Sequence, residues 1–155
     1  HRAMSRIVVM GPAGTGVTLV AASLAARLRA RVLDGDELYP PVSRRRTVAV
    51  DRDAWFRAMS MAFARDADLV VACRPLVRAD RDLVRARTAD VVFVELVAGT
   101  ATAVARRSRW RRTEVAAPPR VDPLAADERG LRVADDADLE SIVDRIATVL
   151  TGGAG

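Results

Sequence analysis

The sequence of 155 residues contains no lysine, no asparagine and no glutamine, so all 25 of its basic side chains are arginine. Its single histidine is residue 1, which argues against Ser-His or Cys-His nucleophilic catalysis and against a histidine-based zinc site. Its single cysteine, Cys73, excludes an intramolecular disulfide and is expected to be a small buried residue of a protein in the reducing cytoplasm. The remaining candidates for catalysis and ligand binding are arginines, carboxylates and backbone groups.

Long apolar runs and internal repeats are absent as well. The longest apolar runs, "LVVAC" at 69–73 and "VVFVEL" at 91–96, have the length of a strand, so no membrane-spanning helix is expected. The apolar run at 7–10 leads into a glycine-rich loop, which does not fit a signal peptide. The length fits one domain, expected at 6–150, with a tag remnant at 1–5 and a disordered tail at 151–155.

Strand-like apolar runs alternate with helix-like segments, which is typical of βα units on a parallel sheet. We expect a single α/β domain with a five-stranded, mostly parallel sheet and helices on both of its faces. The strands are expected at 6–10, 31–34, 69–73, 91–96 and 130–134, and the helices at 17–29, 51–65, 75–88, 100–112 and 138–150.

The stretch "GPAGTGVT" at 11–18 follows the first expected strand and nearly fits the phosphate-binding pattern G-x-x-x-x-G-K-[ST], but Val17 occupies the lysine place. Three glycines allow the chain to curl and aim successive N–H groups at one spot, to which the helix N-terminus adds positive potential. The alternative is an ordinary glycine-rich βα turn. The residues expected to bind nucleotide are Gly11, Ala13, Gly14, Thr15, Gly16, Val17 and Thr18, with the Thr18 hydroxyl also expected on Mg²⁺.

The stretch Asp34-Gly35-Asp36 ends the second expected strand, where side chains face the ligand crevice of an open α/β sheet. Because the two carboxylates are two residues apart, we expect them to point to the same side. One of them could orient the Mg²⁺ shell while the other takes a proton from an attacking hydroxyl. The alternative is an Asx turn with capping aspartates.

Five arginines surround Trp110 in "RRSRWRR" at 106–112, and the net charge of the chain is +5. Three interpretations stay open: arginines that clamp phosphate groups, a solvated helix end, and a nucleic-acid surface, of which the last is the least favoured. One of these arginines could also replace the charge that is missing at Val17.

The sequence from 7 to 150 resembles the gluconate kinase (gluconokinase) family, small phosphate-loop kinases related to shikimate and nucleoside-monophosphate kinases. The resemblance rests on "LDGDELYPP" at 33–41, "DRDAW" at 51–55, "ACRPLVRADRDLVR" at 72–85 and "ADERGLRVADDADLESIV" at 126–143. In the third block, family members typically read alanine-cysteine-serine-alanine-leucine-lysine-arginine at the start.

The resemblance implies an ATP- and Mg²⁺-dependent phosphotransferase, a homodimer, that acts on a small sugar acid or hydroxy acid. It implies metal binding by Asp34 together with Thr18, catalytic roles for Asp36, Arg52 and Arg78, and a short lid at about 111–126. It further implies that Arg107 and Arg111 clamp ATP phosphates. The acceptor would be held by Asp36, Tyr39, Arg52, Arg78 and Arg81.

Several positions depart from the family pattern and put activity in doubt. Val17 replaces the loop lysine, Tyr39 a histidine, Ser43 an asparagine and Val77 a basic residue. The segment at 43–51 and the lid are also short. We therefore expect either a phosphotransferase with impaired activity or a pseudokinase that binds nucleotide, phosphate or a protein partner. An arginine-rich nucleic-acid-binding protein is a weaker alternative.

Overall fold

The structure is a computed structural model that describes residues 5–12, 14–38, 52–99 and 122–152. Strands and helices alternate along these segments, as the apolar pattern predicts. The elements, in chain order, are β1 (Arg6–Met10), α1 (Val17–Leu28), β2 (Arg31–Asp34), the short 3₁₀ helix η1 (Gly35–Leu38), α3 (Arg52–Arg65), β3 (Leu69–Cys73), α4 (Arg78–Arg87), β4 (Val92–Val97), β5 (Gly130–Ala134) and α6 (Leu139–Leu150).

The five strands form one sheet in the order β2-β3-β1-β4-β5, and every neighbouring pair is parallel. The expected α/β domain with a five-stranded sheet is therefore confirmed. The chain places β2 and β3 on one side of β1 and β4 and β5 on the other. Ligands of open α/β sheets bind where the strand order reverses, at the carboxyl ends of the strands. This rule directs attention to the loop that follows β1.

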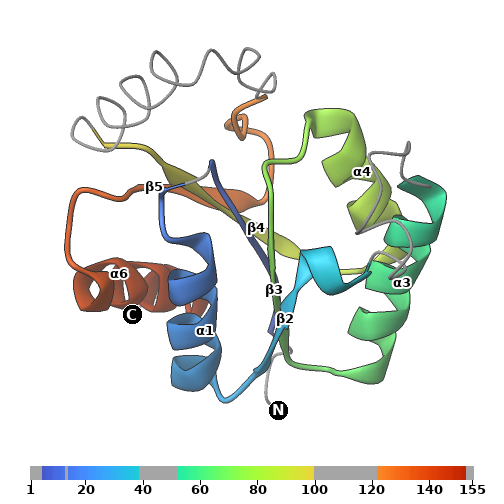
Figure 1. The fold of residues 1–155 in the computed structure, drawn as a ribbon, viewed down its shortest axis with the longest axis horizontal. Coiled ribbons are helices and arrows are strands. Elements are labelled where there is room, and N and C mark those ends of the chain that lie inside the picture. Colours follow the sequence, from blue (N-terminus) through green and yellow to red (C-terminus); the bar gives the residue numbers. More distant parts are fainter. Residues whose placement is uncertain (1–4, 13, 39–51, 100–121, 153–155) are drawn as a thin grey trace.

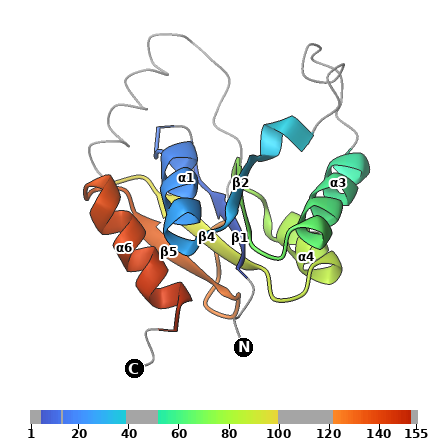
Figure 2. The same cartoon turned by 90° about the horizontal axis from the view of Figure 1, so that it is seen from below.

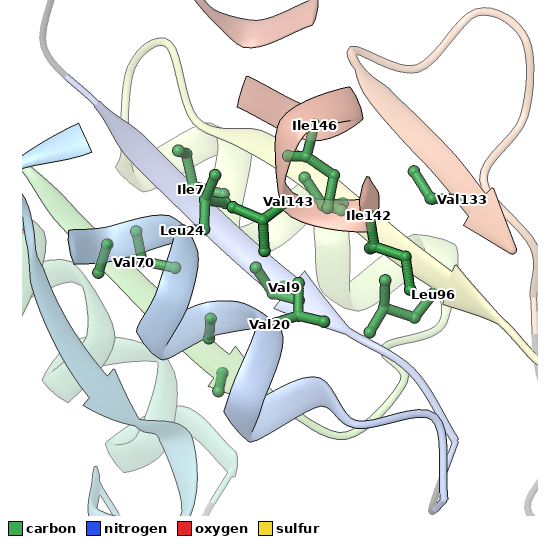
Figure 3. Close-up of a cluster of buried hydrophobic side chains, with 14 of the residues drawn as sticks. Ile7, Val9, Val20, Leu24, Val70, Leu96, Val133, Ile142, Val143 and Ile146 are labelled. Carbon is green, nitrogen blue, oxygen red and sulfur yellow. The ribbon is translucent and has the colours of Figure 1, made fainter. Parts of the chain in front are cut away.

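Helices cover both faces of the sheet: α1 and α6 lie on one face, and α3 and α4 lie on the other (Figures 1 and 2). Successive residues of β1 point to opposite faces, so Ile7 and Val9 join the core beneath α1 and α6 (Figure 3), whereas Val8 and Met10 join the core beneath α3 and α4. The central strand is thus buried from both sides. This burial explains why its sequence is a continuous apolar run.

The ends of the elements differ from the expected ranges by a few residues. Helix α4 begins at Arg78 rather than at 75, because Val77 has an extended backbone with ψ 160°. Thr151 and Gly152 were expected in the tail, but their N–H groups donate to Ala147 and Val149 and close α6. The expected helix at 100–112 lies outside the described residues. Within the described segments, no helix is long and apolar enough to cross a bilayer.

Candidate active site

The loop after β1 is held in shape by its own side chains. The Thr15 hydroxyl donates to the Pro12 carbonyl at 2.6 Å, and Thr15 is only 4% exposed. A Cβ on Gly11 would lie 2.8 Å from Thr15 Oγ1 and 3.1 Å from Leu96 Cβ, so the first loop position accepts only glycine without rearrangement. The backbone N–H of Thr15 also donates to the Pro12 carbonyl, at 3.2 Å, so both donors of this residue are used within the loop.

The second half of the loop opens onto free space at the start of α1. Gly14 and Gly16 have φ values of 90° and 78°, which residues with a Cβ rarely adopt. Gly16 caps the helix without a side-chain hydrogen bond, and a Cβ added there would meet no atom of the described residues within 4 Å. Thr18 is exposed in the first turn, which carries no acidic side chain. The N–H groups of a helix's first turn have no partner within the helix, and together with the helix dipole they suit an anion here.

Val17 is turned toward the protein interior. Its Cγ2 lies 3.0 Å from the position that a Cβ on Gly11 would occupy, and the side chain packs against the core beneath α1 and α6. The residue therefore contributes apolar packing under the loop and its amide to the first turn. It brings no charge to a phosphate group.

Asp34 and Asp36 form a tight turn at the carboxyl end of β2. The Asp36 N–H donates to Asp34 Oδ1 at 2.9 Å, which is the Asx turn considered as the alternative. Asp36 belongs to η1 and not to an extended strand, so strand alternation does not put the two carboxylates on the same side. Both residues are exposed, and the turn leaves them accessible to a ligand.

The neighbouring strand and helix fix this turn in place. A Cβ on Gly35 would lie 2.9 Å from the Ala72 carbonyl oxygen, and the Trp55 Nε1–H donates to the Gly35 carbonyl at 2.8 Å. Trp55, expected to be a core residue, is buried and also anchors the aspartate turn. Burial, followed by the charges of Asp36 and Asp34, raises the pKa of the Cys73 thiol to about 12, which keeps it protonated and unreactive.

The arginines expected to bind the acceptor carboxylate are paired with carboxylates of the protein. Arg52 is paired with Asp80, and Arg78 donates to both oxygens of Asp127 at 2.7 and 3.0 Å. The hydrogen bonds from Arg78 lower the pKa of Asp127. Both arginines are exposed, and exposed pairs of this kind are worth about 0–1 kcal/mol, so an incoming carboxylate can compete for them.

Arg81 lies in the interior of the protein. Its side chain is 0% exposed and donates to both oxygens of Glu128 at 2.6 and 2.7 Å. The remaining hydrogen bonds run to the backbone carbonyls of Leu76, Asp122 and Pro123. The resemblance implies that Arg81 contacts the acceptor, and in the structure its guanidinium already donates to five oxygen atoms of the protein. It ties α4 to the segment at 122–128.

Sequence reasoning missed Glu128, which organises this buried cluster. Its carboxylate accepts from Arg81 and from the N–H of Ala125, and it is also paired with Arg85. These contacts hold the pKa of Glu128 at about 2, with the Arg81 hydrogen bond as the largest cause. Glu128 stands in the quoted block "ADERG", but nothing in that block distinguishes a buried carboxylate from an exposed one.

Four residues of the expected site, Ala13, Tyr39, Arg107 and Arg111, lie outside the described residues. The same is true of most of the expected lid at 111–126, of which 122–126 belong to the segment tied to α4. In the described part of the chain, no cluster of three or more His, Cys, Asp or Glu side chains could hold a metal by itself.

Comparisons with known proteins identify the fold. No protein-family model matches the sequence, and no curated protein matches it. Among solved structures, a gluconokinase from Sinorhizobium meliloti 1021 superimposes with a TM-score of 0.73 at 25% identity and covers 100% of both chains. The chain has the fold of the phosphate-loop kinases. The predicted resemblance to the gluconokinase and shikimate kinase group is thereby confirmed.

Two further solved kinase structures have a similar fold. A sugar kinase from Janibacter sp. HTCC2649 has a TM-score of 0.73 at 23% identity, over 96% of this chain and 95% of that one. The shikimate kinase of Aquifex aeolicus has a TM-score of 0.59 at 15% identity, over 96% and 98%. Both alignments extend over nearly all of each chain.

Proposed function

We propose that this protein transfers the γ-phosphoryl group of ATP to a hydroxyl of a small sugar acid or hydroxy acid. The observation that supports the proposal most directly is the open, anion-accepting start of α1, with the exposed aspartate turn one strand away across β3. The similarity to a gluconokinase and a sugar kinase supports the same chemistry and the acceptor class.

In the proposed reaction, the loop amides hold the β-phosphate while Asp36 receives the acceptor. The acceptor hydroxyl oxygen bonds to the γ-phosphorus, and its proton passes to the Asp36 carboxylate. The bond from the γ-phosphorus to the β–γ bridging oxygen breaks, and its electron pair leaves on ADP. The proton then passes from Asp36 to water, which restores the carboxylate.

The residues present fit Mg²⁺ at this site. Thr18 and Asp34 offer exposed oxygen atoms on either side of β3, and a hydroxyl, a carboxylate and phosphate oxygens are ligands that Mg²⁺ accepts. When bound, the ion would neutralise charge that develops on the phosphate oxygens. Thr18 and Asp34 would orient it, while the loop amides fix the phosphates.

The carboxylate of the acceptor would displace Asp80 from Arg52 and Asp127 from Arg78. Tyr39 would line the acceptor side, and Arg107 and Arg111 would contact the γ-phosphate. Arg81 would act from the interior by holding the segment at 122–128. We also propose a cytoplasmic homodimer, in line with the family that the chain resembles.

A pseudokinase is the second candidate function, and the inward-facing Val17 favours it. Without a cation at this place, the loop amides still bind phosphate, but stabilisation of the transferring group is weaker by roughly 2–4 kcal/mol. Nucleotide binding without transfer is the distinguishing property of this alternative.

Restoring the lysine tests the two functions against each other. In an assay of phosphoryl transfer from ATP to gluconate, we expect measurable turnover by the wild type. Val17→Lys should raise kcat by up to about 10²–10³-fold, because its ammonium reaches the transferring phosphoryl group. Val17→Met is the matched control, since it lengthens the side chain without adding charge.

The outcomes separate the candidates. Nucleotide binding without turnover in the wild type, with turnover only in Val17→Lys, would show a pseudokinase. Equal gains in Val17→Lys and Val17→Met would assign the effect to packing under the loop. Absence of nucleotide binding in every variant would contradict both functions.

A further inference from the structure

Arg74 directly follows β3, the strand that lies between β1 and β2. In the register of the sheet, Met10 pairs with Cys73 and Asp34 pairs with Ala72. The residue after Cys73 is therefore flanked by the first loop glycine on one side and by the aspartate turn on the other. In Figure 1, the start of α1 and η1 lie at this same end of the sheet.

Arg74 differs from the other arginines of its block in having no partner among the described residues. It is exposed, and it forms no hydrogen bond or ion pair with any residue in the described segments. The others are paired with carboxylates: Arg78 with Asp127, Arg81 with Glu128, and Arg85 with Asp82 and Glu128.

At this end of the sheet, the carboxylates beside the loop are not balanced by a positive charge at position 17. Asp34 and Asp36 add negative charge beside the loop, Val17 adds none, and Arg52 is already paired with Asp80. A guanidinium binds phosphate oxygens through two parallel N–H donors, so it can neutralise a transferring phosphoryl group as a lysine does. The family pattern has serine at this place, so the arginine is a feature of this chain.

We propose that Arg74 supplies the positive charge on the γ-phosphate that Val17 does not supply. This inference rests on the proposed function, because it requires ATP in the loop. Arg74 contacts the γ-phosphate oxygens from the β3 side, between the loop amides and the acceptor hydroxyl. In this proposal, the positive charge that the loop lysine would provide at position 17 is provided by the arginine at position 74.

The affinities for ATP and ADP test this assignment without relying on turnover. We expect Arg74→Ala to weaken ATP binding by about tenfold to a hundredfold, the effect of one charge-assisted hydrogen bond or two, with ADP binding unchanged. Arg74→Lys should recover part of the loss. Arg87→Ala is the matched control. Arg87 is also exposed, but it lies at the C-terminal end of α4, away from the end of the helix that follows β3.

A second comparison uses turnover. If Arg74 carries the charge, Val17→Lys should raise kcat more in the Arg74→Ala background than in the wild type. An unchanged ratio of ATP to ADP affinity in Arg74→Ala, or a change confined to the KM of the acceptor, would overturn the proposal and leave the proposed function intact. Failure of the wild type to bind either nucleotide would instead overturn the proposed function.

Discussion

Asp36→Asn should lower kcat by about 10²–10⁴-fold, the usual contribution of a general base. Asparagine keeps the shape of the side chain and leaves the Asp36 N–H bond to Asp34 in place, but it cannot take the proton of the acceptor hydroxyl. The affinity for ATP should stay close to that of the wild type, because the loop amides are untouched. A coupled assay of ADP release, with ATP binding measured by calorimetry, checks both expectations.

Glu37→Gln is the matched control for this substitution. Glu37 is an exposed neighbour in the same 3₁₀ turn, so the variant removes one negative charge at nearly the same place. An equal fall of kcat in the two variants would assign the effect to local charge. An unchanged kcat in Asp36→Asn would remove Asp36 from the reaction.

Arg81→Leu should destabilise the fold by about 3–5 kcal/mol, because it leaves the Glu128 carboxylate buried without its principal partner. The double variant Arg81→Leu/Glu128→Leu should recover part of this loss, since both buried charges are then gone. Arg87→Ala, on the exposed side of the same helix, should change stability by less than about 0.5 kcal/mol. Urea unfolding at pH 7 measures all three. A loss in Arg81→Leu as small as that in Arg87→Ala would contradict a structural role.

The ion pair of Arg81 and Glu128 also makes the free energy of unfolding depend on pH. The pKa of Glu128 is about 2 in the fold and 4.5 in the unfolded chain, so its contribution is complete above about pH 4.5 and disappears as the pH falls toward 2. The shift corresponds to about 3 kcal/mol. Between pH 5 and 3, Glu128→Gln should therefore lose less stability than the wild type. Parallel pH profiles would contradict the shift.

Much of the fold is predictable because its signals are local. The strands 6–10, 31–34, 69–73 and 130–134 are short segments with apolar residues at their centres, and their observed bounds match the expected ones. The loop could be recognised because its glycines are needed locally: Gly14 and Gly16 have a positive φ, and Gly11 has no room for a Cβ. Its strand and helix context then distinguishes it from a chance run of small residues.

The partners of charged side chains could not be predicted, because they depend on segments far apart in the sequence. The distance along the chain is 47 residues between Arg81 and Glu128 and 49 between Arg78 and Asp127. Arginines of one helix therefore look alike in the sequence, although one is buried in an ion pair and another is exposed. The turn at Asp36 was misjudged for a local reason, since a 3₁₀ helix replaces the extended strand.

Binding of ATP–Mg²⁺ by two glycine variants tests the central claim, that the loop at 11–18 holds a triphosphate. Gly16 and Gly152 have nearly the same φ, 78° and 74°, and a Cβ on either would meet no atom of the described segments within 4 Å. Alanine therefore costs each a similar amount, on the order of 1–2 kcal/mol. Only Gly16 lies in the loop. We expect calorimetry to show ATP binding by the wild type and Gly152→Ala, and loss of binding in Gly16→Ala. Equal binding by the two variants, or no binding by the wild type, would contradict the account.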